Sequence, residues 1–392
     1  MKILLTGGGT GGHLIPLLGV VSELKKISAE KKLEEPKFLL ITPASGFNKN
    51  ISESGIKIKT IKAGKLRRYF SWENLKDVFK IPVGAIQSLF YIYRFKPNVV
   101  FSKGGFASVP PVIAAWILRI PIVTHESDII PGLANRIIAR FASKILISFS
   151  AAEKYFKKNK IVLTGNPIRS DIAQGSRENA LEFFNLSPNL PTILIFGGSQ
   201  GARKVNEMIL EILPELTEKC QIIHQCGDKN YQEIKNKIGT KTIVQECKNF
   251  NSNETNYYRL KPEFQNRYRI LPFIKDEMKD AYAVADVVIS RAGANSLAEI
   301  VALNKPNILI PLSTSANNHQ PENAKFFVEK KASLIIDEIN NNPQDLARAI
   351  FKLLSDKNLQ IQIKQNLLEL SPSQSASRKI AGEIMETVEA KK

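Results

Sequence analysis

The chain has 392 residues, 43% of them hydrophobic, and its 55 Lys and Arg against 37 Asp and Glu give a formal net charge of +18. This length predicts two domains, because one compact domain usually has about 100 to 200 residues. The three cysteines form no Cys-x-x-Cys pair, so they indicate neither a disulfide framework nor a zinc site, and they fit a reducing cytoplasm.

The charge is unevenly distributed along the chain. Residues 1–163 contain 26 Lys and Arg against 10 Asp and Glu, whereas residues 164–392 contain 29 against 27. This asymmetry indicates an anionic partner for the first part of the chain, either nucleic acid or an acidic membrane surface. The N-terminus lacks the apolar segment of a signal peptide, and prolines interrupt the most apolar stretch, residues 105–124, so we expect no transmembrane span.

Apolar strand-like runs alternate with helical patterns from the N-terminus onward. Strands are predicted at residues 2–6, 37–42, 97–102 and 121–126. The alternation indicates βαβ units in a parallel sheet. Residues 192–210 repeat the opening pattern of buried strand, glycine loop and helix, which predicts two Rossmann-like domains in tandem. The Gly-Asn-Pro turn within residues 163–171 is the predicted hinge between them.

The first glycine loop, GGGTGGH at residues 7–13, contains the pattern G-x-G-x-x-G. A glycine turn between strand and helix lets the backbone approach an anion, and the helix N-terminus adds free N–H groups. A nicotinamide site also needs an acidic residue at the end of the second strand, but that strand ends in LLITPASG without one. The loop therefore favours an anionic ligand other than a dinucleotide, with a turn that binds nothing as the alternative.

His13 follows this loop at the carboxyl edge of the predicted sheet, where open α/β sheets bind ligands. His125 and His319 are also expected in loops that follow strands. For each of the three, the alternative to a functional role is a satisfied, partly buried side chain.

Residues 62–96 contain eight Lys and Arg and eight aromatic residues against two acids. Such a mixture is typical of single-strand nucleic-acid grooves and equally of interfacial membrane surfaces. For the membrane surface we expect insertion of Phe70, Trp72, Phe79, Phe90 and Tyr91. A solvated basic face over a core helix is the alternative.

Two later segments carry further candidates. In residues 287–300 a strand, a glycine turn and a helix recur, and Ser296 with Glu299 fits a capping box. The functional alternative is that Glu299 holds a ribose diol. In residues 317–324, Gln320 and Asn323 are expected either to bind hydroxyl groups or to begin a helix. No Asp-x-Asp triplet occurs, so no metal ion is expected to hold a diphosphate. Backbone N–H groups and cationic side chains are expected to bind it instead.

Seven segments together resemble the MurG family of bacterial transferases, which add N-acetylglucosamine (GlcNAc) to lipid I. They occur in the family's order and spacing: GGTGGH, SKGGFASVP, HESDIIPGLANR, GNPIR, GGSQGARKVN, DVVISRAGANSLAEI and HQPENA. The resemblance implies the GT-B fold, with two Rossmann-like domains facing across a cleft and a C-terminal helix that returns to the first. It also implies UDP-GlcNAc as donor, undecaprenyl-diphosphate-MurNAc-pentapeptide as acceptor, and no cofactor.

The resemblance also implies a division of labour between the domains. Residues 1–163 with 374–392 are expected to bind the acceptor and the membrane, and residues 164–373 to bind UDP-GlcNAc. The family's donor contacts fall on these residues: Thr10, Gly11, Gly12, Arg169, Ser199, Ile274, Ala294, Glu299 and Gln320. Their neighbours complete the set of candidate substrate-binding residues: Gln200, Asn295 and His319.

One departure concerns the segment after the fourth predicted strand. Many relatives read His-Glu-Gln-Asn where this chain has His125, Glu126, Ser127 and Asp128, so an asparagine contact to the sugar is here a carboxylate. Asp128 is expected either to accept a sugar hydroxyl or to help as a base.

Transfer from an α-linked donor into a β1,4 bond inverts the anomeric centre, so one displacement with one general base suffices. His13 is the first candidate for the base, since an unperturbed imidazole titrates near pH ~6.5, and Glu126 and Asp128 are the reserves. We expect a peripheral protein on the cytoplasmic face of the cell membrane, with no nucleic-acid partner. The alternatives are another UDP-sugar enzyme of the same fold, a glycolipid transferase or an epimerase, and a basic nucleic-acid-binding protein.

Overall fold

The computed structural model describes residues 1–8, 11–44, 51, 55–64, 72–169, 171–198, 201–241, 245–247, 257–259, 267–372 and 374–391. Within these ranges it leaves out the side chains of residues 11–13, 15, 72–79, 238–241, 245–247, 257–259 and 316. The chain forms two compact units. Unit 1 is Met1–Ser170 with Pro372–Lys392, and unit 2 is Asp171–Ser371.

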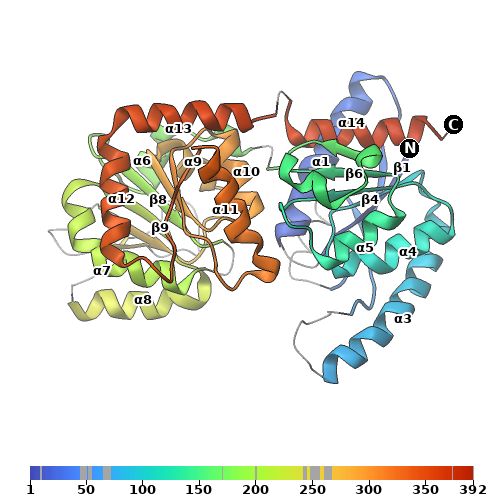
Figure 1. Cartoon of the computed structure of the whole chain (residues 1–392), viewed down its shortest axis with the longest axis horizontal. Helices are drawn as coiled ribbons and strands as arrows, with labels where there is room; N and C mark the ends of the chain where they lie inside the picture. The colour runs from blue at the N-terminus through green and yellow to red at the C-terminus, as the bar shows by residue number, and fades with distance from the viewer. Residues whose placement is uncertain are drawn as a thin grey trace. The chain divides into compact units, whose positions relative to one another are not determined.

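Unit 1 is a parallel sheet with helices on both faces (Figure 1). In the described residues its strand order is β3-β2-β1-β4-β5-β6-β7, and all neighbouring strands in this order pair in parallel. The strands are β1 (Lys2–Thr6), β2 (Lys37–Thr42), β3 (Lys57–Thr60), β4 (Val99–Ser102), β5 (Ile122–Glu126), β6 (Lys144–Ile147) and β7 (Ile161–Leu163). The helices are α1 (Gly11–Glu30), α3 (Trp72–Phe95), α4 (Val109–Ile117), α5 (Leu133–Phe141) and α14 (Ala376–Glu389).

Unit 2 repeats this architecture and extends it with two antiparallel strands. In the described residues the order is β10-β11-β12-β9-β8-β13-β14-β15, and the pairs of β11 with β10 and with β12 are antiparallel. The strands are β8 (Thr192–Phe196), β9 (Gln221–Gln225), β10 (Gln245–Cys247), β11 (Tyr257–Arg259), β12 (Tyr268–Leu271), β13 (Val287–Ser290), β14 (Asn307–Leu309) and β15 (Leu334–Ile335). The helices are α6 (Arg177–Phe183), α7 (Arg203–Lys219), α8 (Asp228–Lys241), α9 (Met278–Val284), α10 (Ala294–Ala302), α11 (His319–Glu329), α12 (Pro343–Ser355) and α13 (Lys357–Leu370).

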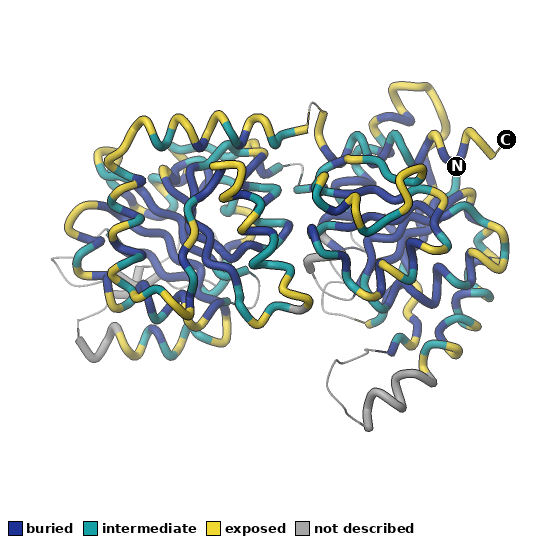
Figure 2. Tube along the Cα trace, in the orientation of Figure 1, coloured by how far each residue is buried: buried dark blue, intermediate teal, exposed yellow. Residues whose placement is uncertain are grey.

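The central strands are buried along their whole length, as Figure 2 shows by colour. Helices cover both faces of these central strands, which explains why they read as continuous apolar runs. The predicted strands at 2–6 and 37–42 agree with β1 and β2 residue for residue. The two parallel-sheet domains of the expected α/β fold are therefore confirmed.

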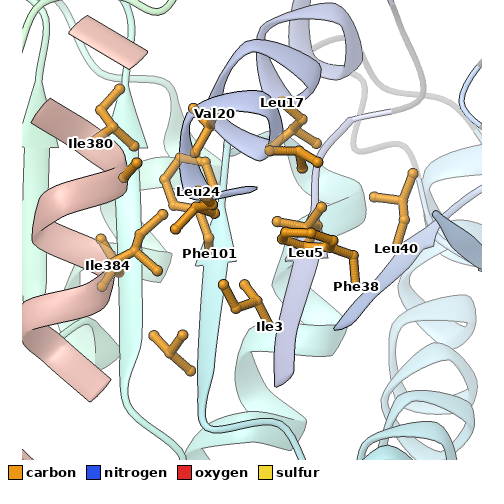
Figure 3. Packing of buried hydrophobic residues seen from close by; sticks show 14 of the residues in the cluster. Ile3, Leu5, Leu17, Val20, Leu24, Phe38, Leu40, Phe101, Ile380 and Ile384 are labelled. Carbon is orange, nitrogen blue, oxygen red and sulfur yellow. The ribbon is translucent and has the colours of Figure 1, made fainter. Parts of the chain in front are cut away.

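The C-terminal helix α14 belongs to the core of unit 1. Its Ile380 and Ile384 are fully buried and point toward Val20 and Leu24 of α1 (Figure 3). Two ion pairs also link α14 to the end of α1 and the residue that follows it. Arg378 pairs with Glu30 at 2.6 Å, and Glu389 pairs with Lys31 at 3.4 Å.

The boundary between the units lies a few residues later than the sequence predicts. The predicted boundary falls between residues 163 and 164, whereas unit 2 begins at Asp171. Thr164 to Ser170 lie with unit 1. The cause is local: the Gly165 carbonyl accepts a hydrogen bond from His125, and Asn166 Oδ1 accepts one from Lys103. Arg169, expected in the second domain, is consequently part of unit 1.

Helix α3 presents an apolar stripe to solvent. Val83, Ile86, Phe90 and Tyr93 are spaced by three or four residues and are 42%, 67%, 59% and 70% exposed. Trp116 of the adjacent helix α4 is 54% exposed. The expectation for Tyr91 is wrong, because this ring packs against the core beneath Lys59 Nζ. Phe70 and the side chains of Trp72 and Phe79 lie outside the described residues. Within the described ranges, no helix is both long and apolar enough to span a bilayer.

Truncation of Ile384 tests the contribution of α14. Ile384→Ala removes a side chain that is 0% exposed, so it should lower the free energy of unfolding of unit 1 by about 2 to 5 kcal/mol. Denaturant unfolding, followed by probes in each unit, should show the unit 1 transition at a lower concentration. Ile361→Ala is the control, because this helical isoleucine is 52% exposed and should change stability by no more than about 0.5 kcal/mol. Equal effects of the two substitutions would contradict a structural role for α14.

Candidate active site

Both sheets reverse their winding direction at one point, and loops with glycines follow the strands there. In unit 1 this point lies between β1 and β4, and in unit 2 between β8 and β13. Open α/β sheets bind ligands at the carboxyl ends of the strands beside such a point. The candidate residues of each unit therefore gather around one predictable place.

In unit 1, the two loops at this point are joined by their backbones. The Gly8 N–H donates a hydrogen bond to the Gly104 carbonyl at 3.0 Å, and the Lys103 N–H donates to the Thr6 carbonyl at 2.8 Å. Gly104 has φ of +86°, and a Cβ atom there would lie 2.2 Å from Asn135 Oδ1. Only glycine fits this position.

Lys103 is buried beneath these loops and is 1% exposed. Its Nζ atom lies 2.9 Å from His125 Nδ1 and 2.9 Å from Asn166 Oδ1, and it also donates to Ser127 Oγ. His125 Nε2 lies 2.9 Å from the Gly165 carbonyl, which only accepts, so Nε2 carries the proton and Nδ1 accepts from Lys103.

Glu126 and Asp128 are adjacent to this lysine. The Asp128 N–H donates to Glu126 Oε1 at 2.9 Å, and Asn135 Nδ2 donates to Glu126 Oε2 at 2.8 Å. Glu126 is 4% exposed, whereas Asp128 is only partly buried. Both oxygens of Glu126 therefore already accept hydrogen bonds from the protein.

Burial shifts the ionisation of this cluster. Desolvation, reinforced by the neighbouring Asp128 charge, raises the pKa of Glu126 to about 7. Desolvation also lowers the pKa of Lys103 to about 7 against the opposing pull of the Glu126 and Asp128 carboxylates. Burial and the Lys103 charge hold the pKa of His125 well below its usual range, which keeps this imidazole neutral.

The other unit 1 candidates include the residues of the first glycine loop. Gly11, Gly12 and His13 form the first turn of α1, and the side chain of His13, like all of Thr10, lies outside the described residues. The expectation of a loop position for His125 is wrong, because it lies inside β5 and is 0% exposed. Its pairing with the Gly165 carbonyl and Lys103 makes it a satisfied interior histidine.

In unit 2, a second glycine loop follows β8 and precedes α7. Gly198 and Gly201 have φ of +83° and +74°, and a Cβ atom on Gly201 would lie 2.2 Å from the Cys226 carbonyl. Gln225, at the end of β9, donates from Nε2 to the Gly198 carbonyl at 3.3 Å, and its Oε1 accepts from the Ile274 N–H at 2.9 Å. One buried side chain thus ties the glycine loop to Ile274. Ser199 and Gln200 lie outside the described residues.

Glu299 is on the neighbouring helix α10, which also begins with Ala294 and Asn295. The capping-box interpretation is wrong, because the helix begins at Ala294 with Gly293 as its N-cap, and Ser296 lies inside it. Glu299 Oε2 instead accepts from the Tyr282 hydroxyl at 2.8 Å, and burial raises the pKa of Tyr282 well above its usual range. The hydroxyl therefore remains a donor that orients the carboxylate.

The segment around residues 317–324 begins α11. His319 is its first residue, and Gln320 Oε1 accepts from the Leu312 N–H at 2.9 Å. Asn323 Nδ2 donates to the Ala292 carbonyl at 3.1 Å, which holds α11 against the loop after β13. Gln320 and Glu299 thus belong to helices that follow adjacent strands, β14 and β13.

Sequence reasoning missed Lys103, Gln225 and Tyr282 as parts of these sites. Lys103 carried the clearest signal, a lysine between an apolar strand and two glycines.

In the part of the chain that the structure describes, no His, Cys, Asp and Glu side chains gather in a group that would hold a metal ion.

Comparisons with known proteins match both units. Residues 3–147 match the glycosyltransferase family 28 N-terminal domain, and residues 192–382 match the glycosyltransferase family 28 C-terminal domain. The chain is 39% identical to a UDP-N-acetylglucosamine–N-acetylmuramyl-(pentapeptide) pyrophosphoryl-undecaprenol N-acetylglucosamine transferase of Bacillus cereus, over 90% of this chain and 91% of the relative. It is 38% identical to the transferase of the same name from Legionella pneumophila, over 98% and 96%.

Solved structures show the same fold. MurG of Acinetobacter baumannii superimposes with a TM-score of 0.71 at 24% identity, covering 98% of this chain and 99% of that one. A UDP-GlcNAc 2-epimerase of Neisseria meningitidis reaches a TM-score of 0.62 at 13% identity, covering 100% of both chains. At these identities, the structures establish the fold alone.

The raised pKa of Glu126 predicts a pH-dependent loss of stability. A carboxyl whose pKa is raised by folding contributes stability that is full below its unfolded-state pKa, and that is lost as pH rises through its folded-state pKa of about 7. Glu126→Gln cannot ionise, so its free energy of unfolding relative to the wild type should rise between about pH 5 and 7, by at most about 1.4 kcal/mol per pH unit.

Denaturant unfolding of both proteins across this range is the measurement. Glu182→Gln is the control, because Glu182 is an exposed carboxylate of unit 2. A constant difference between Glu126→Gln and wild type at all pH values would show that Glu126 does not titrate in this window.

Proposed function

This chain belongs to glycosyltransferase family 28, among its N-acetylmuramyl-(pentapeptide) pyrophosphoryl-undecaprenol GlcNAc transferases, and we propose that it carries out the reaction for which they are named. It transfers GlcNAc from UDP-GlcNAc to the 4-hydroxyl of the MurNAc sugar in lipid I, giving lipid II for peptidoglycan synthesis. The observation that carries the proposal is the identity to these transferases, which extends through both units.

The donor binds to unit 2 in this proposal. The glycine loop after β8 and the N-terminus of α7 face the diphosphate with backbone N–H groups, and Ser199 adds a side-chain donor. Glu299 accepts from the ribose hydroxyls, and Tyr282 fixes the direction of its carboxylate. Because the Ile274 N–H donates to Gln225, we assign the Ile274 carbonyl to the uracil ring N–H.

Gln200, Ala294, Asn295, His319 and Gln320 complete the donor site in the proposal. The backbone N–H groups of the glycine loop and of α7 stabilise the negative charge that develops on the departing UDP, so no divalent ion is required. The chain contains no Asp-x-Asp triplet, which supports metal-independent transfer.

The acceptor binds to unit 1, where one base removes the proton from its 4-hydroxyl. The hydroxyl oxygen then attacks the anomeric carbon as the bond to UDP breaks, which inverts that centre. His13 is the proposed base because it lies in the first turn of α1, at the point where the sheet reverses its winding. Asp128 is the second candidate. Glu126 is less suited, because it is buried and both of its oxygens accept from protein N–H groups.

Activity of the purified full chain tests the function. UDP should be released from UDP-GlcNAc only with a lipid I analogue of short prenyl chain, and EDTA should not reduce the rate. Glu299→Gln should raise the KM for UDP-GlcNAc about 10-fold to 100-fold, the usual value of hydrogen bonds to a charged group. The glutamine Oε1 still accepts from Tyr282, so the fold is retained.

Glu329→Gln serves as the control, since Glu329 is an exposed residue at the end of α11. No UDP release with the acceptor would contradict the function. Conversion of UDP-GlcNAc to its 2-epimer without an acceptor would indicate an epimerase instead. An unchanged KM in Glu299→Gln would remove Glu299 from the donor site.

We also propose that unit 1 docks on the cytoplasmic face of the cell membrane through residues 62–96. The acceptor is a lipid, and the excess of basic residues in 1–163 attracts the chain to anionic headgroups. The exposed stripe of Ile86, Phe90 and Tyr93 supplies apolar side chains for insertion.

Replacement of this stripe tests the docking. Ile86→Ser, Phe90→Ser and Tyr93→Ser together should weaken binding to anionic vesicles at least about tenfold, because three apolar groups no longer leave water. Wild-type binding should fall with salt and be lost on neutral vesicles. Vesicle sedimentation measures both effects.

The paired substitutions Ile361→Ser and Leu368→Ser are the control, because they remove exposed apolar residues from α13 of unit 2. Equal vesicle binding by wild type and the triple variant would contradict docking through α3. Preferential binding of the wild type to single-stranded DNA at physiological salt would favour the nucleic-acid alternative.

A further inference from the structure

Lys103 is a buried lysine at the point where the sheet of unit 1 reverses its winding. It directly follows β4, its N–H donates to the end of β1, and its side chain is almost fully buried. An ammonium in the protein interior is costly unless each of its N–H groups finds an acceptor. Within the described residues it finds three.

These acceptors belong to two other segments of the chain. His125 and Ser127 lie at the carboxyl end of β5 and just after it, and Asn166 follows β7. One ammonium thus connects the segments that leave three strands of the sheet. The orientation of these bonds is unambiguous at His125, because its Nε2–H is committed to the Gly165 carbonyl.

The carboxylates of the candidate site lie on the same short segment. Glu126 and Asp128 alternate in sequence with the two anchored residues His125 and Ser127, and the Asp128 N–H donates to Glu126. Both carboxylates act electrostatically on Lys103, and the Lys103 charge in turn lowers the pKa of Glu126. Loss of Lys103 would remove the ammonium that links this segment to Asn166.

We propose that Lys103 is a positioning residue for the transfer reaction, which holds residues 125–128 against Asn166 and thereby fixes Asp128 where the acceptor binds. This inference rests on the proposed function and adds to it a residue that touches neither substrate. It places the effect of Lys103 on the acceptor side, because the proposed donor contacts on α10 and α11 are in unit 2.

Lys103→Met in the full chain tests this assignment, because methionine has a similar length and no N–H group. We expect kcat to fall at least about tenfold while the KM for UDP-GlcNAc stays near the wild-type value. The KM for the lipid I analogue should rise, because Asp128 is no longer held where the acceptor binds.

Lys144→Met is the matched control. Lys144 is a partly buried lysine of unit 1 at the start of β6, and its ion pairs with Glu383 and Glu386 tie the sheet to α14. Its loss should lower stability and leave kcat and both KM values near those of the wild type. If Lys103→Met behaves in the same way, Lys103 is a structural residue only and the inference is wrong.

A second variant covers the case in which Lys103→Met does not fold. Ser127→Ala removes one acceptor of the ammonium with little change in volume, and it should lower kcat and raise the KM for the lipid I analogue by smaller factors. Unchanged kinetic constants in a folded Ser127→Ala protein would overturn the inference. Absence of UDP release by the wild type would instead contradict the proposed function, so the two failures are distinguishable.

Discussion

The hydrogen bond from the Gly8 N–H to the Gly104 carbonyl is the contact on which the unit 1 site depends. It brings together the loops that follow β1 and β4, which leave the sheet in opposite winding directions. The approach is possible only because Gly104 has no Cβ atom, which would collide with Asn135, the residue whose Nδ2 donates to Glu126. Helix α1, which begins with the His13 turn, and the buried cluster are therefore positioned by one backbone contact between two glycine loops.

In unit 2, a side chain joins the two segments at the carboxyl ends of the strands. The glycine loop after β8 is tied to Ile274 by Gln225, which donates to one segment and accepts from the other. A neutral amide satisfies both partners without placing a charge in the interior. Unit 1 uses an ammonium in the corresponding region, and two carboxylates offset part of its desolvation cost. The difference fits a proposed donor site made mainly of backbone groups and a proposed acceptor site that must handle a proton.

The sequence predicted the strands and glycine loops well, because buried parallel strands are continuous apolar runs and glycine clusters follow them. It failed where a position depends on partners distant in sequence. Lys103 and its acceptor Asn166 are 63 residues apart, so no local sequence pattern shows that they meet. The S-x-x-E pattern at Ser296 predicted a helix start that is wrong, because α10 begins at Ala294 with Gly293 as its N-cap. The antiparallel strands β10 and β11 were not foreseen, because they are short.

The position of α14 has a consequence for synthesis on the ribosome. Ile380, Ile384, Met385 and Val388 belong to the same core as the first strand, yet they are translated after the whole of unit 2. A nascent chain can complete unit 2 while the α1 face of unit 1 is still open to water, because domains fold as units during translation. Nascent unit 1 is thus the part of the chain most exposed to wrong hydrophobic partners, and the segment synthesised last is the one that closes it.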